Sequence, residues 1–383
     1  MPLATTKPGG AGSERYDRIL LIAHHINKHT GNVFEYFRQN SRELFVFSYA
    51  PSFQEPVCLL ETFRHGAKKR ERRYAWYRGR NVGLKYFFYL LYYLDAVWFR
   101  LPGRTITITF HPLFCVLNSL SRLFKNDRTV FWVYDHFPSR KGLYYLYNLM
   151  ADHYDRRLRH VLYLGTALED VYRGISGPAK AGYYRGVVDF GVRPVPRSGA
   201  PVPGLLGFVG DLKLYQGIRL AYQALKADPS LRLEIMGDGA NKEDFRIWAE
   251  ADGVADRVRF LGYVDEADVL GVVGRWQLGL APYEPDGNSC MFYAFPGKAV
   301  FYLQYGLPVI TTKVTRFHQV IQKYSAGVVI DYDAGSLSRA IKDVQERRGA
   351  YLGGVERYCR DHEYSVYYDD KFDFLRTLIP RTV

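Results

Sequence analysis

The sequence predicts an α/β protein built from two doubly wound domains in tandem, with a cleft between them. Short runs of β-branched and aromatic residues alternate with segments of helix length, and this alternation is typical of βαβ units with parallel strands. A stretch rich in proline and glycine, residues 192–204, has no apolar periodicity and separates two such series. The length of 383 residues fits two domains better than one.

The first series contains five expected strands, joined by segments long enough for helices. These strands cover residues 18–23, 44–49, 105–110, 130–134 and 161–164. The start of the chain contains Gly, Pro, Ser and Thr and lacks this pattern. We therefore assign residues 1–15 to a flexible N-terminus and residues 16–195 to the first domain.

The second series contains six expected strands and belongs to a domain that we assign to residues 196–360. The strands cover residues 205–209, 231–236, 258–261, 278–281, 308–311 and 327–330. Residues 216–226 and 242–251 carry apolar side chains at helical spacing. Doubly wound sheets bind ligands at the carboxyl ends of their strands, so we expect the functional site in the cleft between the two sheets.

The excess positive charge lies in the first half of the chain. The net charge of the whole chain is +13, yet residues 1–195 hold 29 basic and 15 acidic residues, whereas residues 196–383 hold 23 and 24. A one-sided charge of this kind indicates that the first domain meets an anionic surface, either a membrane or a nucleic acid.

The cysteines and apolar segments argue against several classes of protein. The four cysteines form no C-x-x-C pair, which argues against a zinc cluster and a disulfide framework. Residues 1–18 lack the apolar core of a signal peptide, so we expect a cytosolic protein. The most apolar stretch, residues 86–94, is far shorter than the roughly 20 residues that span a bilayer.

Five motifs in the second half of the chain carry a family resemblance. They are GFVGDLK at 207–213, IMGDG at 235–239, VRFLGYV at 258–264, GLAPY at 279–283 and PGKAVFYLQYGLPVI at 296–310. In this order and at these spacings they resemble the nucleotide-sugar-binding domain of GT-B glycosyltransferases of the family-4-like superfamily, over residues 203–345. The resemblance implies two Rossmann-like domains and a final helix, within residues 361–383, that crosses back to the first domain.

The resemblance also implies a site for a nucleoside diphosphate sugar in the second domain. Glycines near a helix start let a diphosphate approach backbone N–H groups, and Lys298 would neutralise the leaving nucleoside diphosphate, with Lys213 as a second candidate. The expected donor-binding residues are Gly210, Lys213, Gly262, Tyr263, Val264, Tyr283, Tyr293, Lys298 and Phe301. The alternative is that these glycines only form strand-to-helix turns and that Lys298 is a solvated surface lysine.

The chain departs from the family pattern at two places. Retaining members carry two glutamates eight positions apart, where this chain has Tyr293 and Phe301. The basic pair of the family's glycine loop is replaced by Asp211 and Gln216. The pattern is closer to divergent bacterial exopolysaccharide transferases such as the inverting glucuronosyltransferase of xanthan synthesis. We therefore expect inversion at the anomeric carbon.

Inverting transfer needs a base that takes the proton of the acceptor hydroxyl, and two segments offer one. Asp135 follows the apolar run 130–134, where open α/β sheets place ligands, in a segment similar to the one that carries the base aspartate of the xanthan enzyme. Asp135 is the expected base, and a helix N-cap or turn residue is the alternative. His24 and His25, after the first strand, are the other candidate catalytic residues. These histidines have no carboxylate partner at ligand spacing, so we expect no metal and no other cofactor.

A cluster of basic residues precedes the aromatic stretch 86–94. The expected membrane-facing residues are Lys68, Lys69, Arg70, Arg72, Arg73, Arg78, Arg80 and Lys85. Basic residues beside an amphipathic aromatic helix are typical of a protein that lies on an anionic membrane. The alternative is a buried core helix beside a solvated loop. The chain shows no nucleic-acid-binding motif, so we expect no nucleic acid partner.

These features together predict a metal-independent hexosyl- or glycuronosyltransferase. It would move a sugar from a nucleoside diphosphate sugar, with UDP favoured, to a glycan or polyprenyl-diphosphate-linked acceptor in bacterial exopolysaccharide biosynthesis. The enzyme would be cytoplasmic and peripheral at the inner face of the cell membrane. The alternative, which the missing glutamates motivate, is a catalytically silent GT-B protein that acts as a binding or chaperone subunit.

Overall fold

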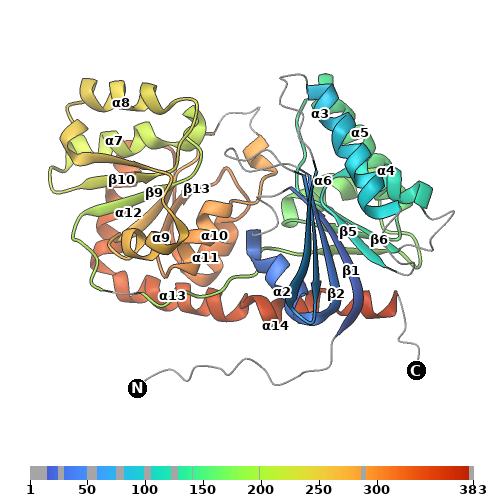
Figure 1. Cartoon of the computed structure of the whole chain (residues 1–383). Coiled ribbons are helices and arrows are strands. Elements are labelled where there is room, and N and C mark those ends of the chain that lie inside the picture. Colours follow the sequence, from blue (N-terminus) through green and yellow to red (C-terminus); the bar gives the residue numbers. More distant parts are fainter. Residues whose placement is uncertain are drawn as a thin grey trace, which may run out of the picture.

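The protein consists of two α/β domains that lie side by side, with helices of the C-terminal segment running along one side of both (Figure 1). The computed structural model describes residues 15–24, 30–49, 58–74, 82–98, 105–121, 128–139, 141–197, 199–285 and 290–378. The predicted fold class, two doubly wound domains in tandem, is confirmed.

The N-terminal domain contains an eight-stranded sheet in the order β4-β3-β2-β1-β5-β6-β7-β8. Its strands are β1 (Tyr16–Ala23), β2 (Ser41–Ser48), β3 (Cys58–Arg64), β4 (Ala67–Tyr74), β5 (Ile106–Thr109), β6 (Arg128–Val133), β7 (His160–Tyr163) and β8 (Tyr184–Val187). Strands β2, β1, β5, β6, β7 and β8, in this order across the sheet, are parallel. Strands β3 and β4 add an antiparallel edge next to β2. The helices are α2 (Val33–Asn40), α3 (Val82–Tyr93), α4 (Pro112–Ser121), α5 (Gly142–Arg157) and α6 (Thr166–Ser176), with a short helix η2 (Leu94–Trp98) after α3.

The sequence predicts five of these eight strands and misses β3, β4 and β8. Strand β4 reads AKKRERRY, and seven of its eight side chains are exposed or half-buried. A charged edge strand has no apolar alternation by which to recognise it, and its charges prevent pairing with another sheet. Five residues of the basic cluster, Lys68, Lys69, Arg70, Arg72 and Arg73, therefore belong to a strand of the N-terminal sheet, whereas Lys85 lies on α3 and Arg78 and Arg80 lie outside the described residues.

The C-terminal domain contains a six-stranded parallel sheet in the order β11-β10-β9-β12-β13-β14. Its strands are β9 (Leu205–Val209), β10 (Arg232–Met236), β11 (Val258–Gly262), β12 (Leu278–Ala281), β13 (Val309–Thr312) and β14 (Gly327–Ile330). Its helices are α7 (Ile218–Ala227), α8 (Lys242–Ala251), α9 (Glu266–Val273), α10 (Gly297–Gln304), α11 (His318–Tyr324) and α12 (Ala334–Glu346). All six expected strands are present. These strands can be predicted from the sequence because strands buried in a parallel sheet are continuous apolar runs.

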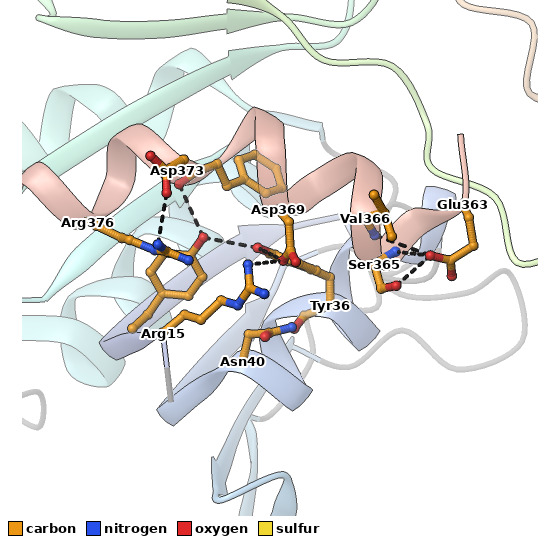
Figure 2. Close-up of polar contacts among 11 residues, drawn as sticks. Arg15, Tyr36, Asn40, Glu363, Ser365, Val366, Asp369, Asp373 and Arg376 are labelled. Atoms are coloured by element: carbon orange, nitrogen blue, oxygen red, sulfur yellow. Dashed lines mark hydrogen bonds and ion pairs between the residues drawn. The ribbon is translucent and has the colours of Figure 1, made fainter. Parts of the chain in front are cut away.

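The last segment of the chain leaves the C-terminal domain through α13 (Arg348–Asp361) and then packs on the N-terminal domain as α14 (Tyr364–Lys371) and η6 (Asp373–Thr377). Tyr36 on α2 donates a hydrogen bond to Asp369 on α14 at 3.0 Å, and Arg15 pairs with the same carboxylate at 2.5 Å (Figure 2). Glu363 caps α14 by accepting hydrogen bonds from the backbone N–H groups of Ser365 and Val366. The two domains are thus held together by a segment from the end of the chain.

Candidate active site

One wall of the interdomain cleft is formed by the carboxyl ends of β1, β2, β5 and β6. These ends carry His24, Tyr49, His111 and Asp135, respectively. The Tyr49 ring lies 5.8 Å from the His24 ring and 6.0 Å from the His111 ring, between centroids. Burial raises the pKa of the Tyr49 hydroxyl, and the charge of Asp135 contributes to the same shift. Four neighbouring parallel strands therefore bring these side chains to one place, as the topology requires.

Asp135 has the properties of a base that works near neutral pH. Burial in the protein raises the pKa of its carboxyl from 3.8 to about 6. The residue as a whole remains accessible to solvent. The N-cap alternative is wrong, because α5 begins only at Gly142 and Lys141 is its N-cap. Asp135 is thus an accessible carboxylate whose environment favours the protonated form.

His111 belongs to this site, although the sequence analysis did not select it. Its ring lies 5.1 Å from the ring of Tyr147, and its Nδ1 accepts a hydrogen bond from the backbone N–H of Leu113 at 3.2 Å. Burial, with His24 nearby, lowers the pKa of His111 to about 4. The imidazole is therefore neutral at physiological pH, with its proton on Nε2. Its position directly after an expected strand was the signal that could have found it.

Of the two candidate catalytic histidines, only His24 lies within the described residues. His24 lies at the end of β1, half-buried, in ring contact with Tyr49. His25 lies outside the described residues. Among the described residues, His, Cys, Asp and Glu form no group of three or more that could hold a metal ion.

A second carboxyl near the cleft, Asp189 after β8, has a structural environment. Burial raises its pKa to about 6, while a hydrogen bond from the backbone of Gly165 and the charge of Lys371 act in the opposite direction. The backbone N–H of Asp189 donates to the hydroxyl of Tyr367 on α14 at 2.9 Å. Asp189 therefore connects the last strand of the N-terminal sheet to the crossing segment.

The opposite wall of the cleft comes from the C-terminal domain and centres on Lys298, at the start of α10. Its Nζ lies 3.9 Å from the centre of the Phe208 ring and 5.1 Å from that of Tyr283, and it donates a hydrogen bond to Gln216. Burial lowers the pKa of Lys298 well below its usual value, and the charge of Asp211 opposes this shift only in part. The reading of Lys298 as a solvated surface lysine is therefore wrong.

Three glycines, Gly210, Gly237 and Gly262, form tight turns at the ends of β9, β10 and β11, and Gly210 lies against the side chain of Lys298. Gly210 and Gly237 have φ of 136° and 128°, and a Cβ on Gly237 would lie 2.1 Å from the carbonyl oxygen of Gly210. The N–H of Gly237 donates to the carbonyl of Gly262 at 2.7 Å. A side chain at Gly237 would collide with this turn, so the close approach of the two chain segments requires glycine.

The other expected donor-binding residues occupy varied positions. Lys213 is exposed and pairs with Asp211 at 2.8 Å. Tyr263 is 66% exposed at the end of β11, and Val264 beside it is half-buried. Tyr283 is buried beneath Lys298, and the half-buried Phe301 packs against Tyr305 with ring centres 4.6 Å apart. Tyr283 contributes to the site only through its contact with Lys298. Gln216, which accepts a hydrogen bond from Lys298, is not among the donor-binding residues that the sequence predicts.

Contacts across the cleft join the two walls. The ring of His136, next to Asp135, lies 5.1 Å from that of Tyr293, which occupies one of the two positions where retaining relatives carry glutamate. Phe190 of the N-terminal domain contacts Phe295 at 5.0 Å between ring centres. The segment that leads into α10 and Lys298 is therefore anchored beside Asp135.

Comparison with known proteins agrees with this geometry. Residues 203–347 match the profile of the family described as glycosyl transferases group 1, whereas no curated protein matches the chain. Solved structures share the fold over nearly the whole length. A sucrose-phosphate synthase from Thermosynechococcus elongatus has a TM-score of 0.68 at 16% identity, covering 94% of this chain and 99% of that one.

Two further structures give the same result. WaaG, a glycosyltransferase of lipopolysaccharide biosynthesis, has a TM-score of 0.62 at 12% identity, covering 95% of this chain and 100% of that one. HepE of Anabaena, in complex with UDP, has a TM-score of 0.62 at 12% identity, covering 94% and 100%. The chain therefore has the GT-B fold, and its residues 203–347 are similar to the glycosyl transferases of group 1. The finer resemblance to the xanthan enzyme stays a prediction.

Proposed function

We propose that the protein transfers a sugar from a nucleoside diphosphate sugar to a glycan or lipid-linked acceptor, with inversion and with Asp135 as the base. The observation that supports this most is the contact of His136 with Tyr293, because it brings the Asp135 wall and the Lys298 segment into one site. A carboxylate with a raised pKa on one side and a buried lysine beside glycine turns on the other are the two groups that the reaction needs.

In the proposed reaction, the ionised carboxylate of Asp135 takes the proton of the acceptor hydroxyl as its oxygen attacks the anomeric carbon. The bond from that carbon to the diphosphate oxygen breaks on the opposite face, and the electron pair stays on the nucleoside diphosphate. Lys298 stabilises the charge that develops there. An incoming diphosphate would also favour the ammonium form of Lys298, whose pKa burial now lowers. The proposal assigns no role to a metal ion.

UDP is the nucleotide that we propose for the donor. The HepE structure contains UDP, and a pneumococcal O-GlcNAc transferase with the same fold, at 12% identity, is described in complex with UDP and GlcNAc. The exposed Tyr263 and the turn at Gly262 offer a stacking surface and backbone groups for a base. The sugar is left open between a hexose and a uronic acid.

For the acceptor, we propose a lipid-linked glycan at a membrane surface of exopolysaccharide synthesis. Two helices of the N-terminal domain, α3 and α5, expose large apolar side chains. These are Leu84, Phe87, Leu91, Leu143, Tyr144, Tyr145, Leu146 and Leu149. Tyr89 and Tyr93 on the other face of α3 are buried, so the core-helix alternative holds for that face only. No helix among the described residues is long and apolar enough to cross a bilayer.

The catalytically silent subunit remains the second candidate, and one observation favours it. Phe301 presents an aromatic ring where retaining relatives have a carboxylate, so one contact to the donor is missing. A silent protein would bind the nucleotide through Lys298 and release no product.

The deciding experiment is a donor screen with UDP-, GDP- and ADP-sugars, read out as release of the nucleoside diphosphate in the presence of lipid-linked acceptors. We expect turnover with a UDP-sugar and loss of about 10²–10⁴-fold in the Asp135→Asn variant. Asp268→Asn, an exposed position on α9, is the matched control and should keep full activity. Nucleotide binding without turnover on any donor would favour the silent subunit, and full activity in Asp135→Asn would remove that residue from the mechanism.

A further inference from the structure

A groove on the N-terminal sheet lies outside the interdomain cleft. It has a volume of about 490 Å³ and is open to solvent on the face of β2, β3 and β4 that also carries α3. Its lining residues are Glu43, Phe45, Leu60, Thr62, Arg64, Lys69, Arg70 and Arg72. Four of these eight side chains are cationic and one is anionic, over a floor of the buried Phe45 and Leu60.

A β-bulge concentrates this charge. Thr62 of β3 pairs with Arg70, but the next residue, Phe63, pairs with Lys68, so Lys69 is an extra residue on β4. In a regular strand, consecutive side chains point to opposite faces of the sheet. The bulge re-aims Lys69, and as a result Lys69 and Arg70 line the same groove.

The cations of the groove are incompletely neutralised. Glu43 already pairs with Arg18 at 2.7 Å and with Arg64 at 2.9 Å. Arg72 pairs with Asp95 of η2 at 3.3 Å. For Lys69 and Arg70, the described part of the chain supplies no carboxylate within ion-pair distance. Two adjacent cations over an apolar floor are suited to a ligand with a phosphate group and an apolar part.

We propose that this groove binds the phosphate of an anionic phospholipid, so that the N-terminal domain holds a lipid headgroup at a defined site. Two contacts connect the groove to the exposed apolar surface of α3. One is the Arg72–Asp95 pair, and the other is the stacking of Tyr74 on Tyr92, with ring centres 5.0 Å apart. A lipid with its phosphate at Lys69 and Arg70 would direct its chains toward the C-terminal end of α3, where Leu91 is exposed and Phe87 follows one turn further along the helix.

This inference deepens the proposed function, because it rests on that function for the membrane setting of the enzyme. It differs from a general attraction between basic residues and anionic lipid, which treats all charges of β4 alike. A defined site requires the side chains that line the groove and tolerates loss of those that point away from it.

The test compares two arginines of the same strand. Arg70 lines the groove, whereas Arg73 is outside it and pairs with Glu71 at 2.7 Å. The full-length protein and the variants Arg70→Ser and Arg73→Ser are sedimented with phosphatidylcholine vesicles, with and without phosphatidylglycerol, and thermal unfolding checks their fold. We expect the Arg70 variant to lose about fivefold in partitioning onto the anionic vesicles, and the Arg73 variant less than about twofold.

A second pair repeats the comparison at the bulge, with Lys69→Ser against Lys68→Ser, whose lysine pairs with Glu61 at 2.9 Å. Titration with soluble dihexanoyl phosphatidylglycerol and with inorganic phosphate separates a lipid from a free anion. Equal losses within each pair would overturn the defined site, as would binding of inorganic phosphate with no preference for the lipid. All measurements omit donor sugar, so a failure here is distinct from absence of transferase activity.

Discussion

The ammonium group of Lys298 lies 3.9 Å from the centre of the Phe208 ring and hydrogen-bonds Gln216, with only the partial influence of Asp211 to offset its charge. A half-buried lysine whose charge is compensated only in part costs stability unless an anion binds beside it. In the proposed function, the protonated form of Lys298 would be stabilised by the nucleoside diphosphate rather than by the fold.

We predict that Lys298→Met raises the melting temperature of the free protein and lowers transfer by about 10²–10³-fold. The apolar side chain removes the cost of burial and also removes the charge that stabilises the leaving group. Thermal unfolding and donor turnover measure the two effects. The pKa of Lys298 is lowered in the folded state, so the unfolded state binds more protons and the wild-type stability rises with pH up to about 10.5. The variant should lack that rise, and a variant that is both less stable and fully active would contradict the assignment.

We predict that kcat/KM falls with a slope of one as the pH decreases through about 6, because Asp135 must be ionised to accept a proton. Its pKa in the folded state is above the unfolded value, so the folded state binds more protons between about pH 4 and 6. Stability therefore decreases as the pH rises through this window, and Asp135→Asn should remove that decrease. A pH–rate profile and unfolding at several pH values test both statements. If the residual activity of Asp135→Asn still falls below about pH 6, another group is responsible for that fall.

His111 should not contribute to that acidic limb. Burial lowers its pKa to about 4, so the ring stays neutral across the pH range in which the enzyme works. NMR of imidazole resonances should show no protonation of His111 above about pH 5, and His111→Asn should lower the rate without moving the limb near pH 6. If the limb moves with His111→Asn, the base assignment to Asp135 is wrong.

We predict that Tyr36→Phe destabilises the protein by about 1 kcal/mol, because it removes the hydrogen bond from a buried hydroxyl to Asp369. Asp369 keeps its pairing with Arg15, which limits the loss. Chemical denaturation gives the free energy of unfolding. Tyr145→Phe, at an exposed tyrosine of α5, is the control and should leave it unchanged. Equal effects in the two variants would show that the bond to α14 contributes nothing.

The sequence predicts the C-terminal domain better than the N-terminal one, and the reason is physical. Strands β9 to β14 are buried in a parallel sheet and read as apolar runs, whereas β4 is an exposed basic edge strand that reads as a charged loop. Lys298 could be found because its motif has a fixed spacing. The position of His111 directly after an expected strand is a local signal, but its contacts and those of Gln216 join distant segments, and the local sequence does not encode these contacts.

The packing of the final segment has a consequence for synthesis on the ribosome. The ring of Phe372 contacts Tyr36, Phe37 and Trp132 of the N-terminal domain, at 5.7, 5.0 and 5.6 Å between centroids. Those three residues emerge from the ribosome long before Phe372 does. The N-terminal domain is translated first, but its apolar surface around these three residues stays uncovered until Phe372 has been synthesised. The sheet from β9 to β14 can be completed before the chain is released. The order of translation and the order of completion of the two domains are opposite.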